Sequence, residues 1–416
     1  MIALRDYQLA AVRAVDRAIV SGERSLLVVA PTGAGKGHVI AHLARRARSL
    51  VLVHRAEIVR DLAARCAPAS VRTLIAGTYD GPADATVTVA LVQSLHAGSV
   101  EIPGLELIVT DEAHHAVAST YRALYARHPQ AFHVGLTATP SRSDGVGLGD
   151  VYDSLYVAAR PSELLARGLL APIRVLAPDS ASSTLADHAA AAYTRHAAGR
   201  SAVVFVRTVA EAHALAESWP EPAAAITGDS AGREDAIARF RRGELRALIN
   251  VYVLTEGTDL PEAEVCILAR GCTSAATYLQ IVGRVLRPLP GKHAMLIDLR
   301  GVVHTHGLPH DDREWSLAGR TGSARASALA MRTCRACWYV YRGDVCPECQ
   351  TAAPPPPPSR VSVRALGEVR TVAREEHGAY LRALVRRFPN PAQARVIFWR
   401  KTGAWPTREQ MERARA

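Results

Sequence analysis

The sequence predicts an α/β protein with two parallel-sheet lobes in tandem, and three observations support that prediction. Short runs rich in Val, Leu and Ile alternate with segments of helical spacing in residues 1–160, and the same alternation returns in residues 161–300. Near-continuous apolar strands separated by helices are typical of a parallel sheet covered on both faces. The chain has 416 residues, which is enough for several domains with their own cores.

Five apolar runs mark the expected strands of the first lobe, each bounded by polar or glycine-containing stretches. They cover residues 25–30, 49–54, 86–91, 105–110 and 132–136. After a passage rich in Pro and Ala at 161–178, a second series covers residues 201–206, 223–227, 247–251, 265–268 and 294–298. Because clefts between domains are common binding sites, we expect a ligand between the two lobes.

The last part of the chain changes character and predicts four further regions. Residues 301–330 are polar and weakly periodic, as in a connector, and residues 331–352 contain four cysteines. A linker at 353–359 follows, and its five consecutive prolines favour a stiff spacer. Residues 360–416 have helical spacing and many arginines, so we expect a small basic helical tail there.

The net charge of +11 is concentrated near the end of the chain. Residues 1–299 hold 30 Lys and Arg against 29 Asp and Glu, whereas residues 300–416 hold 20 against 10. A basic tail on a neutral body favours a polyanionic partner. The alternative is compositional bias, because only three of the 50 basic residues are lysines, namely Lys36, Lys292 and Lys401.

Membrane insertion and secretion are not expected. The sequence has no run of about 18 apolar residues, the length that a membrane helix requires. The first ten residues include Arg5 and Asp6 and lack the apolar segment of a signal peptide. We therefore expect a cytoplasmic protein.

The segment APTGAGKG, residues 30–37, has the composition of a phosphate-binding loop. It follows an expected strand and precedes a segment of helical spacing. Glycines there let backbone N–H groups surround phosphate oxygens, and a lysine reaches the β- and γ-phosphates. The candidate nucleotide ligands are Pro31, Thr32, Gly33, Ala34, Gly35, Lys36 and Gly37. The alternative is a glycine-rich turn that binds nothing.

A second motif, DEAHH at residues 111–115, follows an apolar run about 75 residues after the loop. At the end of a parallel strand, Asp111 can hold Mg²⁺ through water, and Glu112 can orient and deprotonate an attacking water. An isolated Asp-Glu pair is more often a solvated strand end. Asp111 and Glu112 follow an apolar strand, which argues against that alternative.

Four cysteines form the pattern CxxC-x8-CxxC: Cys334, Cys337, Cys346 and Cys349. Paired CxxC turns present four thiolates tetrahedrally, which predicts a structural Zn²⁺ of the ribbon type, with redox-active pairs or disulfides as alternatives. Trp338, Tyr339 and Tyr341 lie between the pairs, beside Arg342. These aromatic side chains could stack on bases or could cover the metal site.

In their order along residues 1 to about 300, these motifs resemble the superfamily 2 helicases and translocases of the DEAH-box kind. The resemblance implies two RecA-like lobes that bind ATP and Mg²⁺ between them. The segment from Leu4 to Gln8 resembles the glutamine motif, which implies nucleotide contacts from Arg5 and Gln8. Other implied first-lobe roles are nucleic-acid contacts by His54, Arg55, Gln93 and Ser94, and coupling of hydrolysis to strand movement by His114, Thr137 and Thr139.

Second-lobe segments resemble the remaining family motifs. Residues 203–207 look like the strand motif that opens this lobe. Thr227 and Gly228 look like a backbone-contacting motif, and residues 255–259 look like the motif between nucleotide and strand. That motif implies strand contact by Thr255 and nucleotide contacts by Gly257 and Asp259.

The segment QIVGRVLR, residues 280–287, carries the arginine-finger pattern and implies catalytic roles for Gln280, Arg284 and Arg287. On a helix, Arg284 and Arg287 would share a face. Arginines supplied from the other lobe stabilise charge on the γ-phosphoryl group only when the lobes close.

The sequence departs from the family at Gly37, where the family has a Thr or Ser whose hydroxyl coordinates Mg²⁺. A water could take that coordination site, or catalysis could be slow. Since both carboxylates and both arginines remain, an active ATPase is favoured over a nucleic-acid-binding module with an impaired ATPase.

Residues 298–301 and 315–317, together with the cysteines, look similar to the RadD branch of bacterial helicases, which acts in DNA repair. The alternative is a phage-encoded relative of the same general plan. We therefore expect an ATP-dependent helicase or translocase. We expect it to act on DNA rather than RNA, as a monomer, with a single-strand-binding protein or a nuclease as a further partner. The alternative is the motor subunit of a restriction or defence assembly. The sequence has no compact Asp…Glu-x-Lys nuclease cluster, so any cutting would come from a partner.

Overall fold

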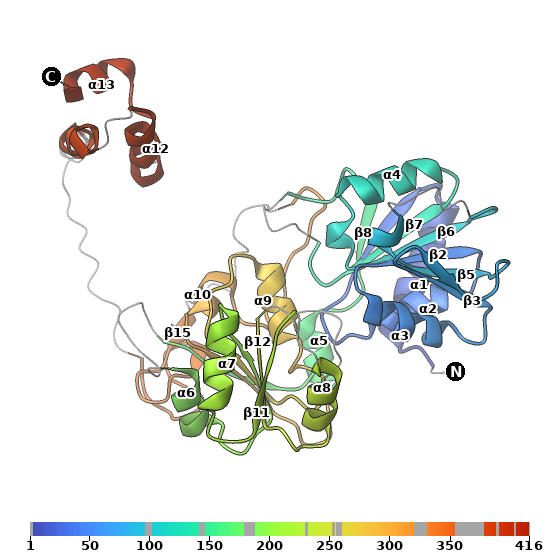
Figure 1. Cartoon of the computed structure of the whole chain (residues 1–416), viewed down its shortest axis with the longest axis horizontal. Coiled ribbons are helices and arrows are strands. Elements are labelled where there is room, and N and C mark those ends of the chain that lie inside the picture. Colours follow the sequence, from blue (N-terminus) through green and yellow to red (C-terminus); the bar gives the residue numbers. More distant parts are fainter. Residues whose placement is uncertain are drawn as a thin grey trace. The chain divides into compact units, whose positions relative to one another are not determined.

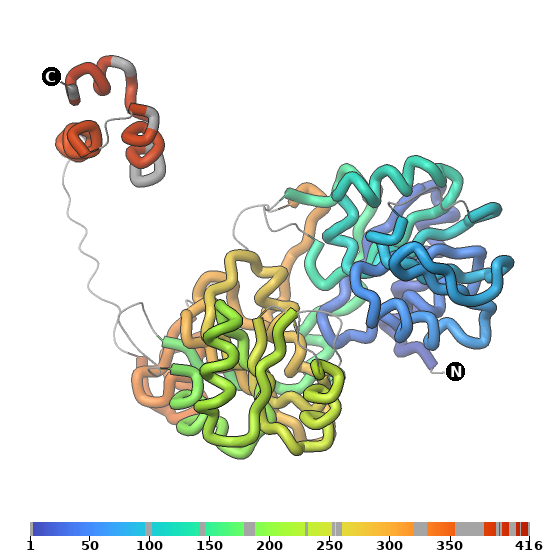
Figure 2. Tube along the Cα trace, in the orientation of Figure 1, coloured from blue at the N-terminus to red at the C-terminus, as the bar shows by residue number. Residues whose placement is uncertain are grey.

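Figure 1 shows the fold as a computed structural model, and Figure 2 traces the same chain as a tube. The structure describes residues 3–95, 102–140, 146–178, 188–228, 232–251, 254, 260–319, 331–353, 378–387, 391–402 and 405–415. Contacts divide the chain into two compact units, Met1–Ala353 and Pro354–Ala416.

The first lobe contains an eight-stranded sheet with the order β4-β3-β5-β2-β6-β7-β1-β8. Its strands are β1 (Ser25–Val29), β2 (Ser49–Val53), β3 (Val71–Ile75), β4 (Thr78–Asp80), β5 (Val87–Leu91), β6 (Leu107–Asp111), β7 (Phe132–Thr137) and β8 (Ser154–Val157). Neighbouring strands pair in parallel except β3 and β4. The carboxyl ends of the central strands therefore meet at one edge, where ligands bind in such sheets.

Helices cover both faces of this sheet (Figure 1). The helical segments are α1 (Asp6–Val20), α2 (Lys36–Ala44), α3 (Ala56–Cys66), α4 (Ser119–Arg127) and the short 3₁₀ turns η1 (Val92–Leu95) and η2 (Ala113–His115). Apolar residues of α1, α2 and α3 pack on one face with Val28 and Val51, and those of α4 pack on the other with Leu27 and Ile108. Alternate strand residues thus supply two cores.

The second lobe contains a six-stranded, all-parallel sheet with the order β11-β12-β10-β13-β14-β9. Its strands are β9 (Ile173–Leu176), β10 (Ala202–Phe205), β11 (Ala223–Ile226), β12 (Ala247–Asn250), β13 (Val265–Leu268) and β14 (Ala294–Asp298). Its helices are α5 (Pro161–Ala166), α6 (Ala189–His196), α7 (Val209–Glu217), α8 (Arg233–Arg241), α9 (Ala275–Val282) and α10 (Val302–His306). The fold predicted from the sequence, two parallel-sheet lobes in tandem, is confirmed.

The sequence did not predict β3, β4, β8 and β9. All four are short, and none is buried along its full length. β4 and β8 lie at the two edges of the first sheet, and β9 lies at an edge of the second. Edge strands lack the continuous apolar run by which the central strands were found.

The connector between the second lobe and the cysteines contacts both lobes. Leu308 is buried in the second-lobe core, whereas Trp315 and Leu317 pack against the core on one face of the first sheet. The amide of Gly149 also donates to the carbonyl of Leu317 over 2.9 Å. Residues 308–319 therefore join the lobes a second time, in addition to the segment between β8 and β9.

The cysteine-rich hairpin, β15 (Met331–Thr333) and β16 (Val340–Arg342), docks on the second lobe. The amide of Ala177 donates to the carbonyl of Trp338 over 3.1 Å, and Leu176 forms an isolated antiparallel bridge with Tyr339. Arg342 also makes two 2.7 Å hydrogen bonds to the carboxylate of Asp311. The hairpin thus covers the edge strand β9, and it belongs to the Met1–Ala353 unit.

The second unit is a small helical cluster with its own core. Its described helices cover residues 378–387, α12 (Pro391–Thr402) and α13 (Arg408–Arg415). Their buried residues pack together: Leu381, Leu384, Ala394, Phe398, Met411 and Ala414. The predicted proline spacer lies outside the described residues. Within the described ranges, no helix has the length and apolar character needed to cross a membrane.

Candidate functional site

The glycine-rich loop lies between β1 and α2, and its backbone conformation requires glycine at two positions. Gly33 has φ +90° and Gly35 has φ +78°, a left-handed conformation that side chains disfavour. A Cβ at Gly35 would also lie 2.6 Å from Nε2 of Gln8. Gly35 caps the amino end of α2, which begins at Lys36. The loop therefore has the backbone form of an anion cradle at a helix amino terminus.

The start of α1 holds this loop in place. Tyr7 donates from its hydroxyl to the carbonyl of Ala34 over 2.8 Å, and Gln8 donates from Nε2 to the same carbonyl over 3.0 Å. The amide of Arg5 donates to Oε1 of Gln8 over 2.9 Å. Gln8 is buried. The structure thus places Gln8 against the phosphate loop, with its amide engaged by main-chain groups.

Asp111 and Glu112 lie at the carboxyl end of β6, facing the loop. Nζ of Lys36 is 3.6 Å from Oε1 of Glu112, and these side chains are only 11% and 13% exposed. Glu112 has φ +46° and ψ +55°, which is rare for a residue with a side chain. Such strain is retained where the surrounding structure demands it, and it clusters at functional sites.

The two carboxyl groups differ in acidity. Burial, reinforced by the charge of Glu112, raises the pKa of Asp111 to about 6. Burial also opposes ionisation of Glu112, but the nearby Lys36 and His114 side chains outweigh it and hold its pKa below the usual range. Glu112 therefore ionises at a lower pH than Asp111.

His114 connects Glu112 to the end of β7. Its Nδ1 lies 3.4 Å from Oε2 of Glu112 and 3.2 Å from Oγ1 of Thr137. The Thr137 hydroxyl also accepts from the amide of Thr139 over 3.1 Å and donates to the carbonyl of Thr139 over 3.0 Å. The structure therefore joins the three residues that the sequence assigns to coupling.

The second lobe presents the arginine segment to the phosphate loop. A Cβ added at Gly283 would collide with the side chain of Thr32, so the backbone of Gly283 lies directly against the loop. A Cβ added at Gly33 would lie 3.9 Å from Cγ of Arg287. Arg284 is buried and Arg287 is half-buried. Arg287 therefore lies beside the loop, and Arg284 directly follows Gly283, whose backbone contacts it.

The sequence argument that these arginines share a helix face is wrong. α9 ends at Val282, and Arg284 and Arg287 lie in the turn that follows. This turn is fixed by a 2.8 Å hydrogen bond from the amide of Ala171 to the carbonyl of Leu286. Gly283 itself keeps a right-handed helical conformation, so its missing Cβ matters for the close approach to Thr32 and not for the end of the helix.

Two buried polar groups at this junction have no hydrogen-bond partner within the described part of the chain. They are Oγ1 of Thr32 and Nε2 of Gln280. Buried donors without acceptors are costly, and a phosphate-bearing ligand between the lobes would supply acceptors. This observation fits a nucleotide bound at the loop.

The predicted strand-contacting residues of the first lobe follow adjacent strands. His54 and Arg55 follow β2, whereas Gln93 and Ser94 lie in η1 after β5. Nε2 of Gln93 donates to the carbonyl of His54 over 3.4 Å. Gln93 is exposed, whereas Ser94 is buried, so Ser94 does not present its side chain to the surface.

In the second lobe, Thr227 and Gly228 follow β11. Thr227 is buried and Gly228 is exposed. The predicted contacts at Thr255, Gly257 and Asp259 lie outside the described residues.

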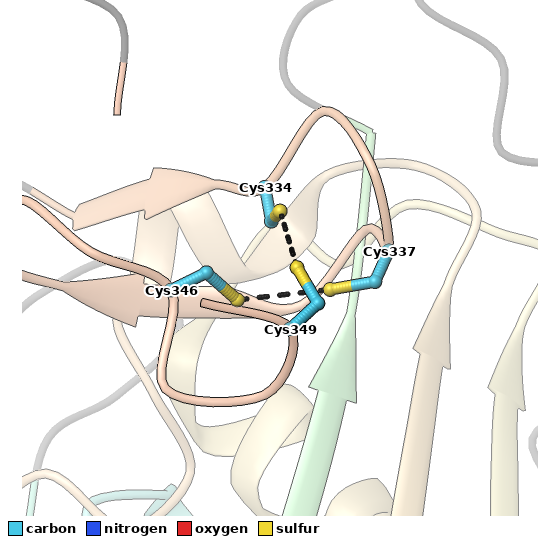
Figure 3. Close-up of side chains that lie close together, drawn as sticks. All are labelled: Cys334, Cys337, Cys346 and Cys349. Carbon is cyan, nitrogen blue, oxygen red and sulfur yellow. Dashed lines mark hydrogen bonds between the residues drawn. The ribbon is translucent and has the colours of Figure 1, made fainter. Parts of the chain in front are cut away.

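The four cysteines converge at one end of the docked hairpin (Figure 3). Their sulfur atoms all lie within 4.8 Å of one another. Sγ of Cys334 is 3.4 Å from that of Cys349, and Sγ of Cys337 is 3.7 Å from that of Cys346. A tetrahedral zinc site with bonds of about 2.3 Å requires sulfur atoms roughly 3.8 Å apart. The measured separations of the sulfur atoms are thus compatible with four thiolates around one Zn²⁺.

The aromatic residues of the hairpin are engaged in packing. Trp338 and Tyr339 pack against the core of the second lobe. Tyr341 is buried beside Cys334 and Cys346. Of the two readings left open by the sequence, the structure supports covering of the cysteine cluster and docking on the second lobe rather than base stacking.

Sequence reasoning missed three residues of the site. Tyr7 holds the phosphate loop, and its position within the segment that resembles the glutamine motif was the signal that could have identified it. Arg65 lies near Gly37, and its Nη1 is 3.2 Å from Nε2 of His38. His115 lies within the DEAHH motif, and its ring is 4.2 Å from that of His114. The doubled histidine was the signal that could have identified His115.

Two family models match this chain in tandem. The model described as "Type III restriction enzyme, res subunit" matches residues 1–142, and the model described as "Helicase conserved C-terminal domain" matches residues 184–288. Two lobes of this kind around a phosphate loop define a helicase-type ATPase. The chain belongs to superfamily 2, the helicases and translocases, as the sequence predicted.

Relatives of this chain include proteins of a phage, an archaeon and yeast. A 51.5 kDa protein of Lactococcus phage (isolate 7-9) is 27% identical over 70% of this chain and 68% of its own. The DNA 3'-5' translocase XPB2 of Sulfurisphaera tokodaii is 25% identical over 72% of this chain and 81% of its own. IRC3 of Saccharomyces cerevisiae is 26% identical to this chain. The match covers 72% of this chain and 51% of the yeast protein.

Solved structures share the fold. The ATP-dependent Type ISP restriction-modification enzyme LlaBIII bound to DNA matches 71% of this chain, with a TM-score of 0.54 and 17% identity. This chain covers 27% of that enzyme. S. cerevisiae Dbp5 bound to RNA and ADP BeF3 matches 73% of this chain and 92% of its own, with a TM-score of 0.53 and 15% identity.

Proposed function

We propose that this protein is an ATP-driven translocase or helicase that acts on DNA. The proposal rests on one observation: groups from both lobes converge on the phosphate loop. The first lobe supplies Lys36 and Glu112, and the second lobe supplies the segment that contains Arg284 and Arg287. This arrangement separates the water-activating base from the cations that stabilise developing charge, as phosphoryl transfer requires.

Each residue has a proposed role in hydrolysis. The amides of residues 33–37 and Nζ of Lys36 would hold the phosphates, and Asp111 would hold Mg²⁺, which neutralises phosphate charge when bound. Glu112, kept ionised by Lys36 and His114, would accept a proton from the attacking water. Arg284 and Arg287 would stabilise charge on the transferred group.

The proposed nucleic-acid path crosses the carboxyl edge of the first sheet at His54, Arg55 and Gln93 and continues in the second lobe at Gly228. The exposed Gln93 and Gly228 support this path. The choice of DNA is supported by the relative named as a DNA translocase. The proposed domains are those predicted from the sequence, an ATP-binding lobe at 1–160 and a C-terminal helicase lobe at 161–300.

The four cysteines would hold one Zn²⁺, and the role of that ion would be structural. The hairpin that carries them covers β9 and pairs through Arg342 with Asp311 of the connector. A bound Zn²⁺ would therefore stabilise the edge of the second lobe.

The basic helical unit would anchor the nucleic acid. Residues 354–416 hold 13 Lys and Arg against 5 Asp and Glu. Arg382 and Arg386 are exposed one turn apart on the helix 378–387, and no carboxylate of the described residues lies within ion-pair distance of them. Uncompensated arginines on one helix face suit a phosphate backbone.

ATP turnover tests the proposed function. Phosphate release by the zinc-loaded chain should be measured alone and with single-stranded DNA, duplex DNA and RNA, beside Lys36→Ala. We expect stimulation that is greatest with DNA and turnover at least about 100-fold lower in the variant. Tight DNA binding without turnover would instead identify a nucleic-acid-binding module with an impaired ATPase, and stimulation by RNA alone would contradict the choice of DNA.

A second candidate is the motor subunit of a restriction assembly, and it is favoured by the restriction-subunit model that matches residues 1–142. Such a motor would move along duplex DNA without separating its strands. Displacement of a triplex-forming strand ahead of the motor, without release of either duplex strand, would favour this candidate. Release of a labelled strand from a partial duplex would favour a helicase.

A further inference from the structure

Three histidine rings form a continuous row beside the proposed catalytic base. The ring of His54 lies 5.2 Å from that of His115, and the ring of His115 lies 4.2 Å from that of His114. The planes are tilted by 47° and 43°. His114 in turn approaches Glu112, with Nδ1 3.4 Å from Oε2. The row therefore starts at a predicted strand-contacting residue and ends at the residue proposed to activate water.

The sheet register explains why distant residues meet in this row. β2 and β6 pair in parallel, with Leu52 opposite Thr110. Both strands then end within one or two residues, so His54 and Glu112 leave the sheet side by side. The left-handed conformation of Glu112 turns the chain directly into η2, which carries His114 and His115. The backbone thus fixes where the rings stand.

His54 and His114, at the two ends of the row, contact residues with predicted roles, whereas His115 between them has no predicted role. At one end, the carbonyl of His54 accepts from the exposed Gln93, which is also a predicted strand contact. At the other end, His114 contacts Thr137 as well as Glu112. His115 is partly buried between them. Packed rings cannot shift independently, so movement of His54 must be accommodated by His115.

We propose that His115 is a positioning residue that transmits engagement of a nucleic-acid strand at His54 to His114, and through it to Glu112. The inference rests on the proposed function and deepens it, because it names the contact by which strand binding accelerates hydrolysis. His115 acts by ring packing, not by proton transfer. A ring of similar size at this position should therefore preserve its effect.

The experiment compares His115→Ala and His115→Phe with the wild-type chain at saturating single-stranded DNA. The readout is the ratio of DNA-stimulated to basal kcat, together with KM for ATP and Kd for DNA. We expect His115→Ala to lower the ratio by about 3- to 30-fold. This range is the fold-change that corresponds to the coupling energies measured for residues between two sites. We expect His115→Phe to keep the ratio within about twofold of the wild type, with KM and Kd little changed in both variants.

His133→Ala is the matched control. His133 lies in β7 of the same lobe, and its ring packs on Tyr125 at 4.4 Å, away from the row. Loss of this packing should destabilise the lobe but leave the contacts among His54, His115 and His114 intact. The ratio of DNA-stimulated to basal kcat should therefore remain that of the wild type. In His54→Ala and the His54→Ala/His115→Ala double variant, the ratios should be alike, because both changes interrupt one route.

Three results would overturn the inference. One is a ratio in His115→Ala within twofold of the wild type. Another is an equal fall in basal and stimulated kcat, which indicates general damage rather than lost transmission. The third is a loss in His115→Phe as large as in His115→Ala. If the wild-type chain itself shows no DNA-stimulated turnover, the proposed function fails first, and the wild-type measurement reveals this separately.

Discussion

Lys36 and Glu112 form an ion pair across the phosphate loop, with Nζ 3.6 Å from Oε1, although they lie on different elements. Lys36 opens α2, and Glu112 follows β6 in a strained left-handed conformation. In a largely buried site, each charge compensates the other. A phosphate group that draws Lys36 away would leave the Glu112 carboxylate next to the water that it is proposed to activate.

Glu112→Gln should abolish most hydrolysis while leaving nucleotide binding in place. The amide keeps the size of the side chain but cannot accept a proton, so we expect turnover to fall by about 10²-fold or more. Phosphate release and titration with a fluorescent nucleotide measure the two effects. Glu106→Gln is the control, because Glu106 is exposed just before the opposite end of β6. Turnover of Glu112→Gln within threefold of the wild type would exclude Glu112 as the base.

Gly37→Ser should lower the Mg²⁺ concentration that catalysis requires. A Cβ at Gly37 would meet Leu62 at 3.5 Å and Arg65 at 3.8 Å, which are ordinary contacts, so a serine fits without backbone strain. Its hydroxyl would supply the metal ligand that this chain lacks. We expect the Mg²⁺ concentration for half-maximal turnover to fall by about 3- to 10-fold, equivalent to roughly one added polar contact.

Gly37→Ala separates the hydroxyl from the extra methyl group. It adds the same Cβ without a ligand, so its Mg²⁺ dependence should match that of the wild type. If alanine and serine shift the Mg²⁺ dependence equally, the effect comes from helix propensity or packing and not from coordination.

The sequence predicted the central strands and candidate site residues, but not how the structure brings those residues together. Phosphate-loop and DEAHH residues are separated by about 75 positions, and they meet because parallel strands end at one edge. By contrast, the half-buried edge strand β9 has no distinctive pattern, since only two of its four residues are buried. The contact between Gly283 and Thr32 also could not be predicted from the sequence, because it depends on where α9 ends.

The aromatic residues of the cysteine hairpin show the same limit. Trp338 and Tyr339 beside arginines are as compatible with base stacking as with packing until the neighbouring surface is known. β9 and the connector supply that surface, and both come from segments with weak sequence patterns. Burial of a side chain is decided by what docks on it, which local composition does not encode.

Removal of zinc should destabilise the second lobe. We expect about one Zn²⁺ per chain by elemental analysis, and loss of it in Cys346→Ser with a melting temperature lowered by a few degrees. Cys346 is buried in the cluster, whereas Cys272 is half-buried outside it, so Cys272→Ser is the control and should retain zinc. A Cys346→Ser protein with full zinc content would contradict a four-cysteine site.

Arg342→Ala tests the docking of the hairpin separately from the metal. It removes both hydrogen bonds to Asp311 but leaves all four cysteines. The zinc content should stay unchanged while the melting temperature falls, because a partly buried carboxylate loses its partner. An unchanged melting temperature would show that the hairpin does not stabilise the lobe through this pair.

Truncation after Ala353 should weaken DNA binding and leave ATP hydrolysis intact. The structure places this cut after the hairpin rather than before it, because removal of residues 331–353 would expose β9. The truncated chain loses 13 basic residues, so we expect its affinity for DNA to fall at least about tenfold at 0.15 M salt and the salt dependence to flatten. Basal turnover without DNA should stay within twofold of the full chain.

Substitution of individual arginines tests whether particular positive charges of residues 354–416 contact DNA phosphates. In Arg382→Ala/Arg386→Ala, the slope of log affinity against log salt should fall by about 1.4 on single-stranded DNA, or about 0.7 per lost phosphate contact. Arg413→Ala is the control, because Nη2 of Arg413 is paired with Oε1 of Glu409 at 2.5 Å and its charge is already compensated. If the double variant and the control have equal slopes, or if truncation leaves the slope unchanged, the arginine excess reflects composition and the anchor lies elsewhere in the chain.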